Sequence, residues 1–520
     1  MKQPLFSVLT PVFDPPIDAL RAAIDSVRAQ DFTDWELILV DDCSTSDAVR
    51  TVLAAAAASD ARVRVVERSA NGGIVASSND ALNLAAGTFV ALLDHDDLLA
   101  NGSLARVARE IASEPDVDYL YTDEDKIDLD GRHFDPFVKP EWSPERLRGQ
   151  MYTAHLSVLR ASLVRDVGGF AIGSSGSQDH DLVMRVTERA RRVIHIPEIL
   201  YHWRAVEGSA AQSVEAKPYA WQAGLDAVQR HLDRSGIRAR AKFGFEPGTY
   251  HIERWLSPET SVSIVIPTRG SRGFVWGESR CLVVETVRSI MEGITHPNFE
   301  IVIVYDNGTP ASVLLELRHI VGERLVLVPF EEPFNFSAKC NVGFLAASGE
   351  ALIFMNDDMQ LVTRRFIEEL VAPLRESGVG ATGARLLFAD GTLQHGGHVY
   401  ADGDLTHAGF GFPGDAEGPF RAYHINRECS GLTAACLAIQ RSVFEEVGGF
   451  GEDLPGNFND VDISRKIRQS GRRMLWISQV TLYHFESLTR DSTVQPWEYE
   501  RIIERWGTPL RDPYFPVHYR

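Results

Sequence analysis

The chain repeats itself over most of its length, and this duplication is the feature that most limits what it can fold into. The segment FSVLTPVFD at Phe6–Asp14 returns as VSIVIPTRG at Val262–Gly270. Further along, DWELILVDDCST at Asp34–Thr45 returns as NFEIVIVYDNGT at Asn298–Thr309. Because the blocks keep their order and each copy is far longer than a solenoid repeat, the sequence predicts two similar domains.

The pattern inside each copy predicts the fold class. Short runs rich in β-branched residues alternate with segments of helical apolar spacing. In the first copy the expected strands are Ser7–Pro11, Glu36–Val40, Arg62–Val66 and Phe89–Leu93, and the expected helices are Ile17–Gln30, Asp47–Ala58 and Ile74–Ala86. Apolar strands separated by helices predict an α/β fold whose parallel sheet is covered on both faces. Such sheets bind ligands at the carboxyl ends of their strands.

Three parts are expected along the chain: an N-terminal domain over 1–210, a connector over 211–260 and a C-terminal domain over 261–520. The connector should be structured, since flexible linkers contain fewer aromatic and β-branched residues. We expect it to contain an amphipathic helix at 217–236, followed by short strands at 239–243 and 249–255. Near the end of the chain, a helix is expected at 497–506, and the tail around Phe515 should pack on the second domain.

Composition excludes several classes of protein. The chain has 52 basic and 72 acidic residues, a net charge of −20, which argues against nucleic acid or an anionic membrane as the main partner. Five cysteines without a CxxC pair predict reduced thiols. Without a leader-like stretch or an apolar run of the ~18 residues that a membrane span needs, we expect a soluble, cytoplasmic protein.

The clearest indication of chemical function is an acidic motif at the end of a predicted strand. In LLDHDD the carboxylates of Asp94 and Asp96 are two residues apart, and on an extended chain they point the same way. Converging carboxylates form a site for Mg²⁺ or Mn²⁺ with positions left for phosphate oxygens. A solvated acidic turn is the simpler interpretation. A metal site is favoured because the second copy places Asn356 and Asp358 after a matching strand.

Other polar residues recur at matching places in both copies. Asp42 and Asp306 each follow the second strand, where a carboxylate can bind a nucleotide base or ribose, or cap the following helix. Asp179 and Asp460 each begin a helical pattern, so they are either general bases or favourable charges at a helix start.

A histidine ends a matching apolar run in each copy, at His202 and His484. Their recurrence favours metal ligands over packed histidines. No GxGxxG follows either first strand, so a dinucleotide-binding domain has little support.

The ordered motifs resemble a known family. The series TPVF, VDDCS, NGG, LLDHDD, KPEWSPE, VGGF, QDHDL and LYHWR is similar to that of family 2 GT-A glycosyltransferases. The second series, from IPT through FMNDDM to LYHFESLTR, is similar to another domain of the same superfamily, and the resemblance covers about 7–210 and 261–490. It implies two GT-A (nucleotide-diphospho-sugar transferase, Rossmann-like) domains in tandem. The pairing is similar to tandem glycosyltransferases of bacterial O-antigen, capsule and exopolysaccharide synthesis.

The resemblance also implies an activity. It is an inverting transfer of a hexosyl or deoxyhexosyl group from a nucleoside-diphosphate sugar to a glycan or lipid-linked glycan, with Mn²⁺ or Mg²⁺ as cofactor. Peripheral association with membrane-bound assembly machinery is left open. The implied roles are nucleotide or diphosphate contact for Asp42, Asp94, Asp306 and Asn356, metal ligation for Asp96, His202, Asp358 and His484, and general base catalysis for Asp179 and Asp460.

Three alternatives stay open. One domain is catalytic and the other binds donor or acceptor, or the chain is a metal-dependent sugar nucleotidyltransferase, or it is a pure interaction protein. The nucleotidyltransferase predicts a Gly/Lys/Arg-rich signature near the first strand, and Pro11–Pro16 offers none. The second copy carries uncharged Asn356, so metal affinity should be weaker there. Its segment Pro267–Gly270 also has no acidic residue to match Asp14, so activity is expected more firmly of the first domain than of the second.

Overall fold

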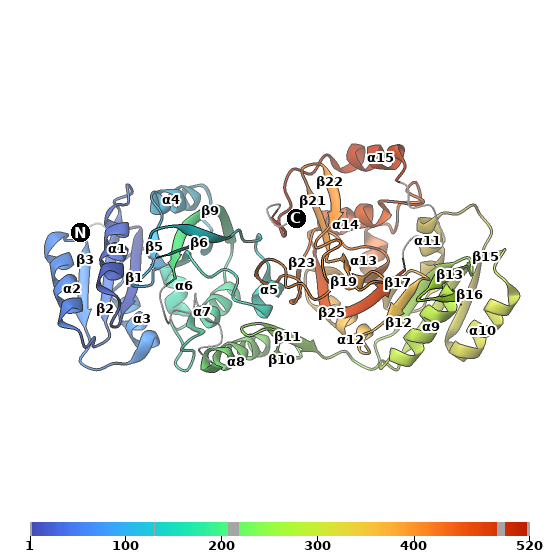
Figure 1. The fold of residues 1–520 in the computed structure, drawn as a ribbon, viewed down its shortest axis with the longest axis horizontal. Helices are drawn as coiled ribbons and strands as arrows, with labels where there is room; N and C mark the ends of the chain where they lie inside the picture. Colours follow the sequence, from blue (N-terminus) through green and yellow to red (C-terminus); the bar gives the residue numbers. More distant parts are fainter. Residues whose placement is uncertain (1–2, 129, 206–217, 486–493, 517–520) are drawn as a thin grey trace. The chain divides into compact units, whose positions relative to one another are not determined.

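The computed structural model describes residues 3–128, 130–205, 218–485 and 494–516. The chain divides into two compact units. The first unit comprises residues 1–251 without 144–146 and 237–239. The second unit comprises residues 252–520 together with those two short segments. Each unit is built around one large sheet (Figure 1). Among the described residues, no helix is long and apolar enough to cross a membrane.

The first unit has a sheet of order β3-β2-β1-β4-β8-β6-β9-β5, with β7 paired to β6. Its strands are β1 (Phe6–Val12), β2 (Trp35–Asp41), β3 (Val63–Glu67), β4 (Phe89–Leu92), β5 (Leu98–Leu99), β6 (Tyr119–Ile127), β7 (His133–Phe137), β8 (Ser157–Arg160) and β9 (Val193–Arg204). Its helices are α1 (Ile17–Arg28), α2 (Asp47–Ser59), α3 (Gly73–Leu84), α4 (Ser103–Ser113), α5 (Pro144–Gly149), α6 (Ala161–Asp166), α7 (Gln178–Thr187) and α8 (Pro218–Arg234). A hairpin of β10 (Ala239–Phe243) and β11 (Tyr250–Arg254) follows.

The second unit has a sheet of order β16-β15-β12-β17-β24-β19-β25-β18, with β20 paired to β19 and β23 to β25. Its strands are β12 (Val262–Thr268), β13 (Arg272–Val275), β14 (Glu278–Cys281), β15 (Phe299–Asp306), β16 (Leu325–Phe330), β17 (Ala351–Met355), β18 (Met359–Leu361), β19 (Val379–Leu387), β20 (Leu393–His395), β21 (His398–Ala401), β22 (Asp404–His407), β23 (Arg427–Glu428), β24 (Cys436–Gln440) and β25 (Arg473–His484). Its α-helices are α9 (Leu282–Gly293), α10 (Ala311–Val321), α11 (Phe336–Ala346), α12 (Phe366–Val371), α13 (Arg441–Glu446), α14 (Asn459–Gln469) and α15 (Pro496–Trp506).

The two sheets repeat one topology, strand for strand, as the duplication predicts. In each, the strands from the amino-terminal part of the unit pair in parallel, as β1 does with β2 and β4, and β12 with β15 and β17. The expectation of a wholly parallel sheet is wrong, because β8 and β24 each run antiparallel to both neighbours. A strand buried on both faces is apolar throughout in either direction, so its sequence does not reveal the direction.

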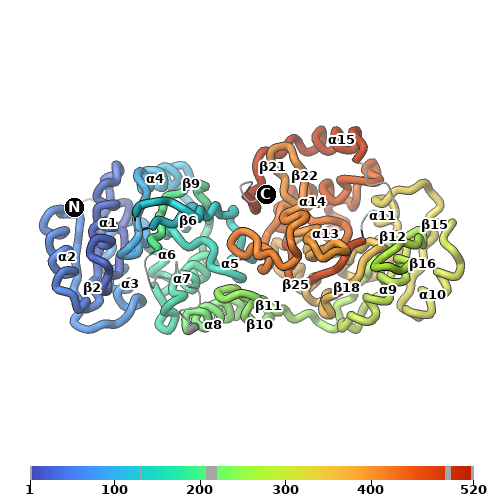
Figure 2. Tube along the Cα trace, in the orientation of Figure 1, coloured from blue at the N-terminus to red at the C-terminus, as the bar shows by residue number. Residues whose placement is uncertain are grey.

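Helices cover both faces of the sheet, as alternation along β12 shows. Val262, Ile264 and Ile266 lie in one apolar core with residues of α9 and α10. Val265 points to the other face and packs in a second core with Cys340 of α11. Figure 2 follows the chain through these layers. The carboxyl ends of the parallel strands are therefore the open edge where loops can form a site.

A buried polar network recurs in both units and fixes the start of the sheet. Ser7 Oγ donates to Glu36 Oε1 at 2.6 Å and accepts from Gly87 N–H at 2.8 Å. A Cβ on Gly87 would lie 2.5 Å from the Ser7 nitrogen, so only glycine fits. The second unit repeats the two bonds with Ser263, Glu300 and Gly349, at 2.6 and 2.8 Å.

Most predicted elements of the first copy are confirmed to within two residues of their ends. The helix expected at 217–236 is α8, the strands expected after it are β10 and β11, and the helix expected at 497–506 is α15. The chain's tail does pack on the second unit, where buried Phe515 stacks on Tyr423. The five cysteines are free thiols, and Cys43 is exposed while the other four are buried. The domain boundaries at 210 and 261 stay a prediction.

Candidate active sites in the two units

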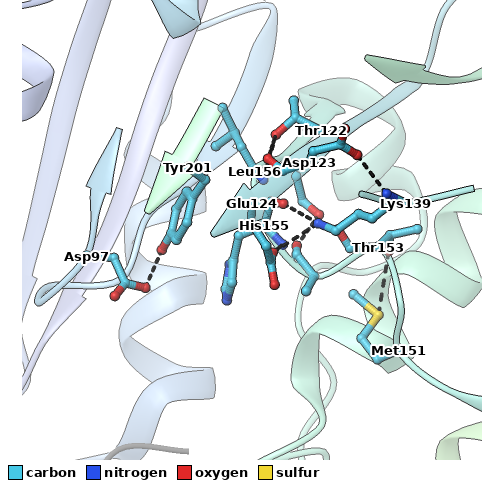
Figure 3. Close-up of polar contacts among 12 residues, drawn as sticks. Asp97, Thr122, Asp123, Glu124, Lys139, Met151, Thr153, His155, Leu156 and Tyr201 are labelled. Carbon is cyan, nitrogen blue, oxygen red and sulfur yellow. Dashed lines mark hydrogen bonds and ion pairs between the residues drawn. The ribbon is translucent and has the colours of Figure 1, made fainter. Parts of the chain in front are cut away.

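In the first unit the loop after β4 gathers acidic residues, as predicted. Possible metal-ligand atoms of Asp94, Asp97 and His155 all lie within 4.8 Å of one another. Asp97 is fully buried, and its carboxylate accepts from the Tyr201 hydroxyl at 2.6 Å and from Arg204 N–H at 2.7 Å. Figure 3 shows Tyr201 reaching Asp97 from the neighbouring strand β9.

The predicted metal ligand Asp96 lies between Asp94 and Asp97 in the chain, but its carboxylate is not part of the cluster that these two form with His155. Burial and the nearby Asp94 charge raise its pKa, and burial raises the pKa of Asp97 well above the usual range. Crowded carboxylates that are costly to ionise together are the arrangement that a bound cation stabilises. The backbone carbonyl of Asp96 also accepts from Arg204 Nε at 2.8 Å, which ties the loop to β9.

His155 is held by a buried lysine that sequence reasoning did not single out. Lys139 Nζ donates to the carbonyl of Thr153 at 2.8 Å, to the carbonyl of His155, and to Glu124 Oε2 at 2.9 Å (Figure 3). The same Glu124 oxygen accepts from His155 N–H at 2.9 Å. Lys139 is fully buried and its charge is paired with Glu124, so this buried ion pair holds the backbone at Thr153 and His155 in place.

His202, another predicted metal ligand, lies in a neighbouring cluster. Its Nδ1 is 2.5 Å from Asp125 Oδ1, and Nδ1 of His133 is 2.9 Å from the other oxygen of the same carboxylate. Metal-binding histidines usually donate one ring N–H to such a carboxylate, which turns the other nitrogen toward the ion. The structure brings Asp94 together with Asp97 and His155, and places His202 with Asp125 and His133.

The two acidic residues at the start of α7 have different surroundings. Asp181 is buried and forms ion pairs with Arg185 at 2.6 Å and Arg230 at 3.0 Å. Within the described part of the chain, the Asp179 side chain accepts a hydrogen bond only from the neutral amide of Gln178, at 3.3 Å. Burial and the charge of Asp94 raise the pKa of Asp179 to about 6. The structure thus makes Asp179, and not Asp181, the residue suited to accept a proton.

Asp42, predicted to contact the nucleotide, binds the chain's own backbone here. Its two oxygens accept from the N–H groups of Gly72 and Gly73, at 2.9 and 2.7 Å, where α3 begins. Arg68 Nε lies 3.0 Å from the same carboxylate. The capping alternative therefore describes this structure, although the cap is on α3 and not on the helix that follows Asp42 directly.

In the second unit a pocket of about 350 Å³ lies at the corresponding edge of the sheet. It brings together the predicted residues Asn356, Asp358, Asp460 and His484. Its wall also contains Lys339, three further histidines and several phenylalanines.

His484 is oriented at both ring nitrogens. Its Nδ1 lies 2.7 Å from Gln394 Oε1, while Nε2 lies 3.2 Å from Asp358 Oδ1 and 3.1 Å from the side-chain nitrogen of Asn356. A neutral imidazole that donates at Nδ1 keeps a lone pair at Nε2, directed at the acidic motif. Between the two motif residues, Asp357 accepts from the Thr268 hydroxyl at 2.5 Å, and burial beside Asp358 raises its pKa to about 7.

The start of α14 repeats the arrangement of α7. Asp462 is buried and paired with Lys466 at 2.7 Å and Arg505 at 2.8 Å. Asp460 instead lines the pocket, and burial raises its pKa although the charge of His407 opposes this. The residue facing the site is again the first of the two.

Asp306, the counterpart of Asp42, is paired with a buried lysine. Lys339 Nζ contacts Asp306 Oδ1 and donates to the carbonyl of Thr268 at 3.1 Å. Lys339 also lines the pocket, so a positive charge lies beside the acidic motif where a diphosphate would need one.

Strand register corrects one matching of the two motifs. Leu98 lies opposite His202 and Met359 lies opposite His484. With the two histidines aligned, Asp358 therefore matches Asp97, and the first motif carries one extra residue. The match of Asp358 with Asp96 is wrong, because comparing the two sequences alone does not show at which residue the next strand, β5 or β18, begins. The roles of both residues stay predictions.

Several site residues were not singled out from the sequence. His155 has no second-copy counterpart to reveal it, since register places Ala435 at the matching position. Lys139 appears in the quoted motif KPEWSPE, but nothing in the sequence indicates that Lys139 or Lys339 is buried. The three pocket histidines lie on β20, β21 and β22, which belong to a segment whose shape the sequence did not predict.

Comparisons with known proteins agree with this architecture. Residues 7–168 and 263–448 match the family described as Glycosyl transferase family 2. The chain is 40% identical over 519 residues to the uncharacterized protein y4gI of Sinorhizobium fredii (strain NBRC 101917 / NGR234), covering 97% of this chain and 56% of that protein. It is 34% identical over 525 residues to the O-antigen biosynthesis protein RfbC of Myxococcus xanthus, covering 99% of this chain and 40% of that protein.

The chain spans about half the length of the curated relatives it matches. One matched region lies in each of the two α/β units, and this confirms the predicted fold class of two GT-A domains in tandem. The matched regions comprise more than half of the chain, which therefore belongs to glycosyl transferase family 2.

Proposed function

We propose that each unit transfers a sugar from a nucleoside-diphosphate sugar to an acceptor hydroxyl, in one inverting displacement. The observation that carries this proposal is the repeated arrangement of a strand-end acidic motif, a histidine on the adjacent strand and a helix-start carboxylate. In each unit the helix-start carboxylate, Asp179 or Asp460, has a raised pKa. A single displacement needs one base and no covalent nucleophile, so one such carboxylate per unit is sufficient.

The residues of the second unit fit a divalent cation. Asp358 Oδ1 and His484 Nε2 lie 3.2 Å apart, and the Asn356 amide can present its oxygen by turning over. In the first unit the candidate ligands are Asp94, Asp97 and His155, while His202 belongs to a separate cluster with Asp125 and His133. Mn²⁺ or Mg²⁺ bound there would stabilise the negative charge that develops on the leaving diphosphate.

The chain's own groups perform the remaining steps. Asp179 or Asp460 accepts the proton of the attacking hydroxyl, and its raised pKa makes it a stronger base than an exposed aspartate. Lys339 adds a positive charge to the wall of the second pocket and holds Asp306 at the end of β15. Asp42 and Asp306 are proposed to contact the nucleotide. For Asp42 this requires exchange of at least one of its bonds to Gly72 and Gly73.

The relatives suggest the biological product. The Myxococcus xanthus relative is described as an O-antigen biosynthesis protein, and an Escherichia coli relative, 28% identical over 247 residues, as chondroitin synthase. We propose that this chain builds a cell-surface polysaccharide, one transfer per unit, on a glycan or lipid-linked glycan. Peripheral association with membrane-bound assembly machinery remains a prediction.

The test is a screen of the purified chain against nucleoside-diphosphate sugars with Mn²⁺ or Mg²⁺, followed by product linkage analysis. Asp179→Asn and Asp460→Asn should each remove one linkage from the product. Asp25→Asn, at an exposed position of α1, is the control and should remove none. If one of the two variants keeps every linkage, that unit is a binding scaffold. Release of pyrophosphate from a nucleoside triphosphate and a sugar phosphate would instead support the nucleotidyltransferase.

A further inference from the structure

Three histidines gather on one wall of the second unit's pocket. His395 ends β20, His398 begins β21 and His407 ends β22. In the hairpin of β21 and β22, His398 and His407 lie directly opposite each other. All three line the pocket that holds Asp460, and each offers a ring nitrogen within 4.8 Å of the others.

The mutual placement of the rings fits coordination of one ion. The ring centroids are 4.8 Å apart for His395 and His407, 4.9 Å for His398 and His407, and 5.2 Å for His395 and His398. The rings are close to perpendicular in each pair, at 80°, 78° and 83°. A tetrahedral zinc ion with Zn–N of about 2.05 Å places imidazole centroids about 3.2 Å from the metal and about 5.2 Å from one another.

The environment keeps these imidazoles neutral and partly oriented. Burial lowers the pKa of His398 and of His407 to about 3, so both retain a lone pair at neutral pH. The Tyr400 hydroxyl lies 2.6 Å from His398 Nδ1, and this contact leaves Nε2 as the nitrogen nearer Asp460, at 3.6 Å. Such an outer partner is the usual support of a metal-binding histidine.

One proton would be displaced when an ion binds. Nδ1 of His395 and Nδ1 of His407 lie 2.7 Å apart, so one donates to the other. The other nitrogen of His395 accepts from Thr433 N–H at 3.4 Å, a long contact that can be given up when the tautomer changes. Coordination by both Nδ1 atoms requires the His395 proton to move from Nδ1 to Nε2, and both imidazoles stay neutral with no net release of a proton.

We propose that His395, His398 and His407 bind one divalent transition-metal ion of the zinc class, at a site separate from the acidic motif of Asn356 and Asp358. Imidazole ligands suit Zn²⁺, whereas Mg²⁺ and Mn²⁺ prefer carboxylate and carbonyl oxygens. The ion joins three strands around the pocket and places a positive charge beside Asp460. The site goes beyond the proposed sugar transfer and does not depend on it.

The test is Zn²⁺ affinity of the full chain, measured by competition with a chromophoric chelator in excess Mg²⁺. With Mg²⁺ in excess to occupy the acidic sites, wild type is expected to bind one Zn²⁺ ion at the three histidines. His398→Gln and His407→Gln should weaken binding of that ion by at least about 10-fold, the loss that removing even a supporting residue causes. His484→Gln, in the acidic site, and exposed His319→Gln should bind as wild type does. Equal affinity for wild type and His407→Gln would overturn the proposal, as would loss of binding only in His484→Gln.

A further variant separates the loss of a metal ligand from a failure to fold. His407→Cys retains a metal ligand, so its Co²⁺ complex should show a thiolate charge-transfer band that wild type lacks. Thermal unfolding without metal should match wild type, and Zn²⁺ should raise the Tm of both proteins. A folded His407→Cys protein that binds Co²⁺ without a thiolate band would show that residue 407 is not a ligand, and would overturn the proposal.

Discussion

Nδ1 of His484 lies 2.7 Å from Oε1 of Gln394, and this bond turns the other ring nitrogen toward Asn356 and Asp358. The first unit orients His202 with a carboxylate instead, that of Asp125 at 2.5 Å. An amide oxygen is a weaker acceptor than a carboxylate. The two units therefore orient equivalent histidines with groups of different strength.

Gln394→Ala should weaken the metal dependence of the second unit. Without its outer partner the His484 ring can rotate, and such losses typically cost 10–100-fold in metal affinity. The measurement is the Mn²⁺ concentration that gives half of the maximal rate of forming the linkage that Asp460→Asn removes. Gln222→Ala, exposed on α8, is the matched control. Unchanged Mn²⁺ dependence in Gln394→Ala would show that Gln394 does not orient the ligand.

The transfer made by the first unit should fall in acid with a midpoint near pH 6. Burial and Asp94 raise the pKa of Asp179 to about 6, so below that pH the base is protonated and the rate drops about tenfold per pH unit. A cation bound beside Asp94 would move the midpoint lower. The rate is measured in the Asp460→Asn background, where only the first unit acts. A rate that shows no fall in acid down to about pH 4, the ordinary pKa of an aspartate, would exclude Asp179 as the base.

Lys339→Met should reduce nucleoside-diphosphate binding by the second unit. It removes a buried positive charge from the pocket and leaves Asp306 and the Thr268 carbonyl without their shared donor. We expect roughly a 10-fold loss in UDP affinity, together with a destabilisation of about 1–3 kcal/mol. Titration with UDP checks the first effect and thermal unfolding the second. Exposed Lys242→Met is the control, and lost stability with unchanged UDP affinity would give Lys339 a structural role only.

Gly349→Ala should destabilise the second unit. The added Cβ would lie 2.6 Å from the Ser263 nitrogen and 2.7 Å from its hydroxyl, and overpacking of this kind costs about 1–3 kcal/mol. Gly308→Ala is the matched control, because its Cβ would meet nothing within 4 Å. Urea unfolding monitored by fluorescence measures both. Equal urea midpoints for the two variants would contradict the prediction, because they would mean that the backbone near Ser263 moves to fit the added methyl group without loss of stability.

The sequence predicted the repeated frame well because strong periodicities determine it. Strand β1 and helix α2 match their predicted segments to within a residue or two at each end. The helix starts left Asp179 and Asp460 open between charge at a helix start and catalysis, and only the family resemblance implied a general base; that role stays a prediction. The ion pairs of Asp181 and Asp462 show how the neighbouring aspartates differ from them.

What the sequence could not predict depends on tertiary contacts. His155 reaches the acidic motif only because β8 runs between β4 and β6, a direction that its apolar residues do not encode. Likewise, the extra residue between Asp94 and Leu98 becomes visible only when β5 and β18 are seen in register with β9 and β25. Contacts of this kind exist only once distant segments have met.

The network of Ser7, Glu36 and Gly87 has a consequence for how such a chain can diversify. Each member fits only while the other two are present, so a change at one is costly until all three change. At the opposite ends of the strands the two units differ, since the first has Lys139 paired with Glu124 and the second has a cluster of His395, His398 and His407. If each unit transfers a sugar as proposed, one frame can be kept in duplicate while the two sets of loops acquire different sugar and acceptor preferences, and such a chain would then specify a disaccharide instead of one linkage made twice.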